Sequence, residues 1–175
     1  MRALLLVLAL AACSSPPEVS DWERQNVLRE APREEAVTPP PFPQRAKLIE
    51  FPMADAAGFH FFVDGSTLSV DKQGIVRYVL VAQSPNGAQN VSFEGLRCPA
   101  AQHRLYATGQ ADGTWIPAAR ATWQPVTQAR RWQMALYLEY FCPQKVAIRD
   151  AGEGVRALQD GGHPFSKGLS PNYGR

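Results

Sequence analysis

The segment 75–83 of this 175-residue chain, IVRYVLVAQ, constrains the fold more than any other stretch. Every second residue in it is apolar, in the series Val76, Tyr78, Leu80 and Ala82. The other series is interrupted by Arg77 and Gln83. Because successive side chains of a β-strand point to opposite faces, this pattern is typical of a strand with one face on a core. We therefore predict a central strand over residues 75–83.

Shorter apolar runs separated by turn residues surround this strand, as in antiparallel sheets. We expect further strands at residues 47–51, 59–63, 67–70, 90–98 and 103–108. An Asn-Gly pair at residues 86–87 favours a hairpin, and a change of parity within 90–98 favours a bulge at Gly95. These runs predict a small antiparallel sheet of about five strands, connected as a meander.

Beyond Trp123 the apolar period lengthens from two to about 3.6 residues. Residues 128–141 lack Gly and Pro and carry a broad apolar stripe, which predicts one C-terminal α-helix covering a face of the sheet. The expected fold class is therefore α+β, with residues 44–150 as a single domain. We expect the Gly-rich segment 151–175 to be a loose tail.

The first residues have the layout of an export signal, a positive charge followed by a short apolar run. The sequence LAAC at residues 10–13 then resembles the lipobox of bacterial lipoproteins. We expect residues 1–12 to be a signal peptide and Cys13 to carry acyl chains that hold the protein on a membrane. Ser14, rather than Asp, favours the outer membrane, with the domain facing the periplasm. The alternative is an ordinary signal whose removal leaves Cys13 unmodified.

Residues 13–43 are expected to form a proline-rich tether behind the lipidated cysteine. Seven of the 15 prolines lie here, including the run PPPFP at residues 39–43. Because each proline ring fixes φ, this run favours an extended, stiff spacer. A recognition site for a proline-binding partner is the alternative. We expect Trp22, which is isolated in this segment, to dock onto the neighbouring domain.

The composition excludes several classes of function. Lys and Arg number 18 against 16 Asp and Glu, a net charge of +2, so no nucleic-acid partner is expected. The longest uncharged apolar stretch, residues 3–12, is shorter than the ~20 residues of a spanning helix. We find no Gly-x-Ser-x-Gly elbow, Walker loop or dinucleotide fingerprint, and expect no cofactor.

Two cysteines remain beside Cys13, namely Cys98 and Cys142. An even pair in an oxidising compartment predicts a disulfide, which would close a loop of about 45 residues. A redox-active pair or half of a metal site is the alternative, although neither cysteine has the close spacing of such sites. The three histidines are scattered, and we expect no metal site.

Several charged residues fall on consecutive expected strands and turns and could line one surface: Glu94, Arg97, His103, Arg104 and Asp112. Polar residues on the solvent face of a sheet do the same without any function. Trp115 follows the Asp112-Gly113 turn, and Arg and Trp are common at interface hot spots. We take Glu94, Arg97, Arg104, Asp112 and Trp115 as a candidate contact surface. The alternative is that Trp115 fills the core at the sheet edge.

Five segments together resemble a known family: 61–64, 66–70, 74–81, 90–98 and 106–115. Their Glu-Gly-x-Arg-Cys and Asp-Gly-x-Trp sequences are similar to those of the CNP-like family of secreted proteobacterial (neisserial-type) proteins. The likeness covers roughly residues 22–142. It implies an exported domain with a two-cysteine framework, but no activity, cofactor or substrate that could be carried over.

Three functions compete on this basis. We expect a lipid-anchored envelope lipoprotein whose domain binds an envelope protein or another envelope component without catalysis. A small-ligand binding domain is the first alternative, and it requires a concave apolar pocket with a few convergent polar groups. A periplasmic enzyme that uses Glu94, His103 or Asp112 for acid–base chemistry is the second.

Overall fold

The computed structural model describes residues 37–53 and 57–166. The expected signal peptide, Cys13 and Trp22 lie outside these residues, as does most of the expected tether. In the described part of the chain, no helix is long and apolar enough to cross a bilayer.

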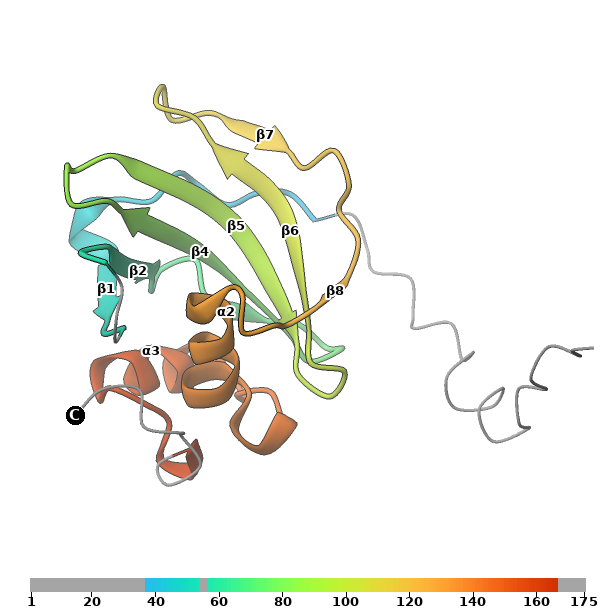
Figure 1. Ribbon diagram of the computed structural model, residues 1–175. Coiled ribbons are helices and arrows are strands. Elements are labelled where there is room, and N and C mark those ends of the chain that lie inside the picture. The colour runs from blue at the N-terminus through green and yellow to red at the C-terminus, as the bar shows by residue number, and fades with distance from the viewer. Residues whose placement is uncertain (1–36, 54–56, 167–175) are drawn as a thin grey trace, which may run out of the picture. The chain divides into compact units, whose positions relative to one another are not determined.

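An antiparallel sheet forms the body of the domain (Figure 1). Its strands run in the order β1-β2-β4-β5-β6-β7, with β3 paired to β4 and β8 paired to β6. The strands are β1 (Leu48–Phe51), β2 (His60–Asp64), β3 (Ser69–Val70), β4 (Ile75–Gln83), β5 (Gln89–Arg97), β6 (Gln102–Gly109), β7 (Trp115–Pro117) and β8 (Gln124–Pro125). The predicted central strand is confirmed, because β4 pairs with β2 and β3 on one side and with β5 on the other.

The expected count of about five strands is wrong, since the sheet has eight strands within the described residues. The strands that were not expected, β7 and β8, are short pieces that pair with opposite ends of β6. β3 lies within the strand expected at residues 67–70 and continues the edge beside β4, where β2 has ended. Two or three residues are too few to show a period of two, which is why β7 and β8 had no signal in the sequence.

The irregularity between β5 and β6 lies on β6 and not at Gly95 as expected. Phe93 pairs with Ala107 and Glu94 with Leu105, so Tyr106 is the extra residue. Gly95 has a different role, because a Cβ there would lie 2.8 Å from the Tyr106 ring. The glycine therefore makes room for the ring that the bulge turns over β5.

The helical layer differs from the single helix that we expected. It contains α2 (Arg131–Ala135), which continues into the π-helical turn η2 (Leu136–Phe141), and α3 (Ala151–Gln159). The short 3-10 turns are η1 (Arg45–Lys47), η3 (Pro143–Lys145) and η4 (Pro164–Ser166). Figure 1 shows α2 lying across one face of the sheet. The apolar stripe is correctly placed, since Leu136, Tyr140 and Phe141 are buried in the core below it.

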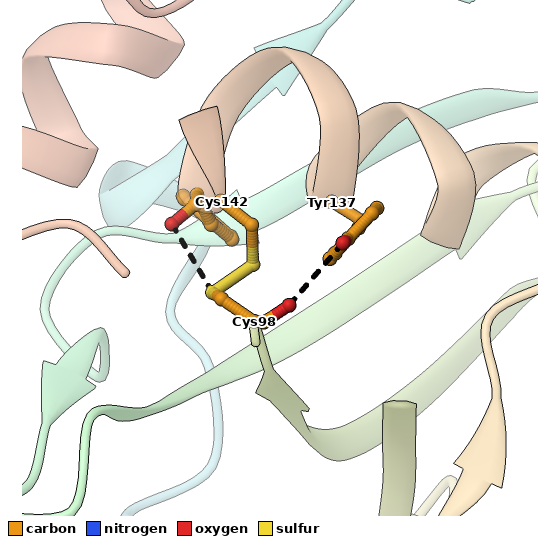
Figure 2. Close-up of a disulfide and its surroundings, with 4 residues drawn as sticks. Cys98, Tyr137 and Cys142 are labelled. Carbon is orange, nitrogen blue, oxygen red and sulfur yellow. Dashed lines mark hydrogen bonds between the residues drawn. A yellow bond between two sulfur atoms is a disulfide. The ribbon is translucent and has the colours of Figure 1, made fainter. Parts of the chain in front are cut away.

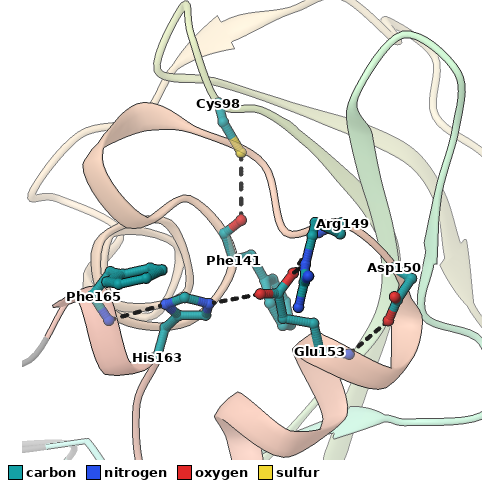
Figure 3. Close-up of polar contacts among 7 residues, drawn as sticks. All are labelled: Cys98, Phe141, Arg149, Asp150, Glu153, His163 and Phe165. Atoms are coloured by element: carbon teal, nitrogen blue, oxygen red, sulfur yellow. Dashed lines mark hydrogen bonds and ion pairs between the residues drawn. The ribbon is translucent and has the colours of Figure 1, made fainter.

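The expectation of a loose C-terminal tail is wrong for residues 151–166. Asp150 caps α3 by accepting a 2.8 Å hydrogen bond from the backbone N–H of Glu153 (Figure 3). Ala157 and Leu158 of this helix are buried in the same core as α2. His163 lies beyond the helix and donates from Nε2 to Glu153 over 3.2 Å. Tertiary packing thus holds a segment whose composition alone suggests disorder.

A disulfide between Cys98 and Cys142 joins the sheet to the helical layer (Figure 2). Cys98 follows β5 and Cys142 follows η2, and their Cα atoms are 5.2 Å apart. Both residues are fully buried, and the Tyr137 hydroxyl donates to the Cys98 carbonyl over 3.2 Å. The pairing predicted from the sequence is therefore present.

The proline-rich run packs on the domain instead of serving only as a spacer. The ring centroids of Phe42 and Trp115 are 5.3 Å apart. Trp115 Nε1 also donates a 2.9 Å hydrogen bond to the Pro40 carbonyl. A Cβ on Gly109 would lie 2.6 Å from Phe42, so the glycine allows this close approach. These contacts cover the face of the sheet opposite α2, above a second core cluster that includes Phe93.

Candidate functional site

A pocket of about 440 Å³ opens beside α2, between the start of that helix and strands β2, β4 and β5. Eight of its twelve lining residues are apolar: Met53, Ala57, Phe59, Phe61, Leu80, Ala82, Ala129 and Trp132. The other four are Asn90, Ser92, Glu94 and Arg131. Its volume lies within the usual range for small-molecule sites, and its lining has their usual apolar character.

Aromatic rings form one wall of the pocket. Trp132 stacks on Phe61 with centroids 5.6 Å apart and an interplanar angle of 15°. Phe59 extends this stack, 6.3 Å from Phe61, and is 38% exposed. Successive side chains of β2 point to opposite faces of the sheet, and Phe61 points to the face that α2 covers. There it meets Trp132 of α2. The wall thus offers flat apolar surface to a ligand.

The carboxylate of Glu94 is the polar centre of the pocket, and the side chain is 5% exposed. It lies on the α2 face of β5 and accepts three hydrogen bonds. They come from Ser92 Oγ over 2.8 Å, Gln133 Nε2 over 2.9 Å and Tyr78 Oη over 3.3 Å. Burial raises the pKa of the Tyr78 hydroxyl well above its usual range, and the Glu94 charge raises it further, so Tyr78 remains a donor.

Gln133 links Glu94 to His103. Its Nε2 also lies 3.2 Å from Nδ1 of His103, on β6. The Glu94 carboxylate fixes the orientation of the amide, since Oε1 in that place would face another acceptor. The second amide hydrogen therefore points at His103 Nδ1. Burial, and then the charge of Arg130, lower the pKa of His103, which favours a neutral ring with its proton on Nε2.

The structure brings together two of the three residues that we considered for acid–base chemistry. Glu94 and His103 meet through Gln133, but an amide cannot relay a proton between them. Asp112 belongs to the β6–β7 turn, where it accepts from the backbone N–H and the hydroxyl of Thr114. These hydrogen bonds lower the pKa of Asp112. Asp112 therefore shapes a turn, and the geometry does not place it with Glu94.

The expected contact surface is divided between the two faces of the sheet. Arg97 and Arg104 lie on the face opposite α2, where Arg97 covers the Trp123 ring at 4.3 Å and Arg104 the Tyr106 ring at 5.1 Å. Trp115 shares that face and is half-buried under the proline-rich run. Glu94 faces the other side. The five residues therefore do not form one surface.

Gln133, the most deeply buried polar residue of the site at 1% exposure, was not among the residues expected from the sequence. A signal was present, because Gln133 lies three, four and seven residues before Leu136, Tyr137 and Tyr140, on the core side of the helix. A glutamine on an apolar stripe requires polar partners inside the core.

Across residues 37–53 and 57–166, no group of three or more His, Cys, Asp and Glu side chains is placed to hold a metal ion. The model of the CNP1-like family matches residues 29–159 of the chain. No curated protein and no solved structure matches it.

Proposed function

The chain belongs to the CNP1-like family. From the geometry of the pocket beside α2, we propose that its domain binds a small organic cation with an apolar body. The pocket beside α2 takes the ligand, and Glu94 receives its ammonium group. The observation that carries this proposal is a buried carboxylate at the polar end of an aromatic pocket, with no cationic partner among the described residues.

The buried charge of Glu94 favours a cationic ligand. Within the described part of the chain, no lysine, arginine or histidine forms an ion pair with it. A buried charge is costly unless it is paired, and hydrogen bonds from Ser92, Tyr78 and Gln133 offset only part of that cost. A carboxylate has about four lone-pair sites, so one acceptor position remains for an ammonium group.

The aromatic wall supports the same class of ligand. A cation over an aromatic face gains about 0.5–2 kcal/mol, and Trp is the best such face. The stacked pair of Trp132 and Phe61 offers apolar area for the body of the ligand. Arg131 also lines the pocket, but its side chain is exposed and water screens its charge.

Location is a separate part of the proposal. We propose that the chain is exported, that Cys13 is acylated, and that the domain faces the periplasm from the outer membrane. The LAAC sequence at residues 10–13 and Ser14 support this location. A pocket displayed in that compartment would meet small molecules of the envelope.

Calorimetric titration with two matched probes tests the binding function. Phenethylamine carries a protonated amine on an aromatic body, and phenethyl alcohol has the same body without the charge. We expect the amine to bind at least about tenfold more tightly, since one charge-assisted hydrogen bond contributes roughly 1.5–3 kcal/mol. Trp132→Leu should weaken both probes. Equal affinity for amine and alcohol would contradict the role given to Glu94.

A further inference from the structure

A second groove lies on the other side of Gln133 and shares no lining residue with the first pocket. It has a volume of about 360 Å³ and lies between β6 and the segment that contains β8. Six of its eight lining residues are polar or basic, namely His103, Arg120, Arg130, Thr122, Thr127 and Gln124, and the other two are the apolar Leu105 and Pro125. No acidic residue is among the residues that line it.

We propose that this groove binds a phosphate group, either free or as a monoester. Arg120 and Arg130 supply the charge, and neither forms an ion pair within the described residues. Guanidinium groups match the oxygens of a phosphate in pairs. The hydroxyls of Thr122 and Thr127 add further donors. The groove therefore offers more donors than the two oxygens of a carboxylate can accept, which favours phosphate over a carboxylate as the ligand.

His103 distinguishes this groove from a merely basic surface. It is 6% exposed, yet it lines the groove. Because the Gln133 amide donates to Nδ1, the neutral ring carries its proton on Nε2, the nitrogen left for the groove. A buried donor held in one tautomer by a neighbouring amide is suited to an anionic oxygen. Gln133 is thus a positioning residue for this groove.

Phosphate titration of the full chain at constant ionic strength tests the proposal. We expect inorganic phosphate or glycerol 3-phosphate to bind, and the tighter of the two identifies the free or the esterified form. Arg120→Ala and Arg130→Ala should each weaken binding about tenfold, the loss of one charge-assisted contact. Both side chains are exposed, so neither substitution endangers folding.

Matched controls distinguish a specific phosphate site from nonspecific attraction of phosphate to positive charge. Lys72→Ala removes one exposed positive charge outside the groove and should leave phosphate affinity unchanged. His103→Phe keeps an aromatic ring at this position without the N–H donor and should weaken phosphate binding severalfold. In the unmodified chain, the ring ¹⁵N signals of His103 should shift when phosphate binds. The proposal is overturned if neither phosphate binds, if acetate binds as tightly, or if Lys72→Ala weakens binding as much as Arg130→Ala.

Discussion

The side-chain amide of Gln133 donates a 2.9 Å hydrogen bond to the carboxylate of Glu94 and so joins α2 to the middle of the sheet. The same nitrogen lies 3.2 Å from His103. One residue of the helix therefore orients the polar centre of the apolar pocket and a polar side chain of the basic groove.

Replacement of Gln133 should destabilise the domain. Gln133→Ala removes both hydrogen bonds and leaves the buried Glu94 carboxylate with one donor fewer, which should lower the free energy of unfolding by about 2 kcal/mol. Urea denaturation followed by circular dichroism measures this. Gln128→Ala, at an exposed position before the same helix, should change it by less than about 0.5 kcal/mol. Similar small effects of both substitutions would show that the buried amide is not a structural link.

The disulfide should account for a large part of the stability. Its cysteines are 44 residues apart, and the chain-entropy account of such a loop gives about 4 kcal/mol. The double replacement of Cys98 and Cys142 by Ala should lower the free energy of unfolding by about that amount, whereas Cys13→Ser should not lower it. A loss below about 1 kcal/mol would mean that the helical layer stays on the sheet without the covalent bond.

The stabilising contribution of Glu153, which joins α3 to the turn that follows it, should be lost at acid pH. Burial raises the pKa of Glu153, but hydrogen bonds from Arg149 and His163 and the charge of Arg149 outweigh it and leave the pKa below its ordinary value (Figure 3). The stabilising contribution is therefore present above about pH 4.3, the ordinary value for Glu, and is lost as pH falls through the folded pKa.

Glu153→Gln tests this pH dependence in thermal melts between pH 3 and pH 7. The variant should melt below the unmodified protein at neutral pH, and the two melting temperatures should converge in acid. Asp160→Asn removes an exposed carboxylate at the end of the same helix and serves as the charge control. A constant difference at all pH values would assign the effect of Glu153 to packing.

Acylation at Cys13 predicts where the protein is found in the cell. The unmodified chain should fractionate with the outer membrane. Cys13→Ser should yield either an unprocessed precursor in the inner membrane or a soluble form, because the thiol that receives the lipid is absent. Immunoblots of separated membranes measure this, and unchanged processing and fractionation of Cys13→Ser would exclude the lipid anchor.

Features with a local signal could be predicted from the sequence. The period of two in residues 75–83 predicts the two faces of β4 directly. The even pair of Cys98 and Cys142, taken with an oxidising compartment, predicted their bond. The Asp150-x-x-Glu153 spacing of α3 is also a local signal, the capping box. The expectation of a loose tail rested on the glycines alone and did not use this spacing. The small size of the glycines in fact allows close packing, since a Cβ on Gly154 would lie 2.5 Å from Leu68.

Contacts between distant segments could not be predicted in the same way. The hydrogen bond from Trp115 to Pro40 spans 75 residues, and neither local sequence indicates the other. The pocket has the same origin, because Phe61, Glu94 and Trp132 meet only when β2, β5 and α2 are in place. Charge and residue type identified Glu94 as a candidate, but its partners arise from tertiary packing.

The affinity of phenethylamine for Glu94→Gln, compared with the unmodified chain, tests the central claim most directly. This substitution keeps the size of the side chain and removes its charge. We predict at least about tenfold weaker binding and loss of the preference for amine over alcohol. Glu50→Gln, which neutralises an exposed carboxylate on β1, should leave the affinity unchanged. Undiminished binding of phenethylamine to a folded Glu94→Gln protein would contradict the account.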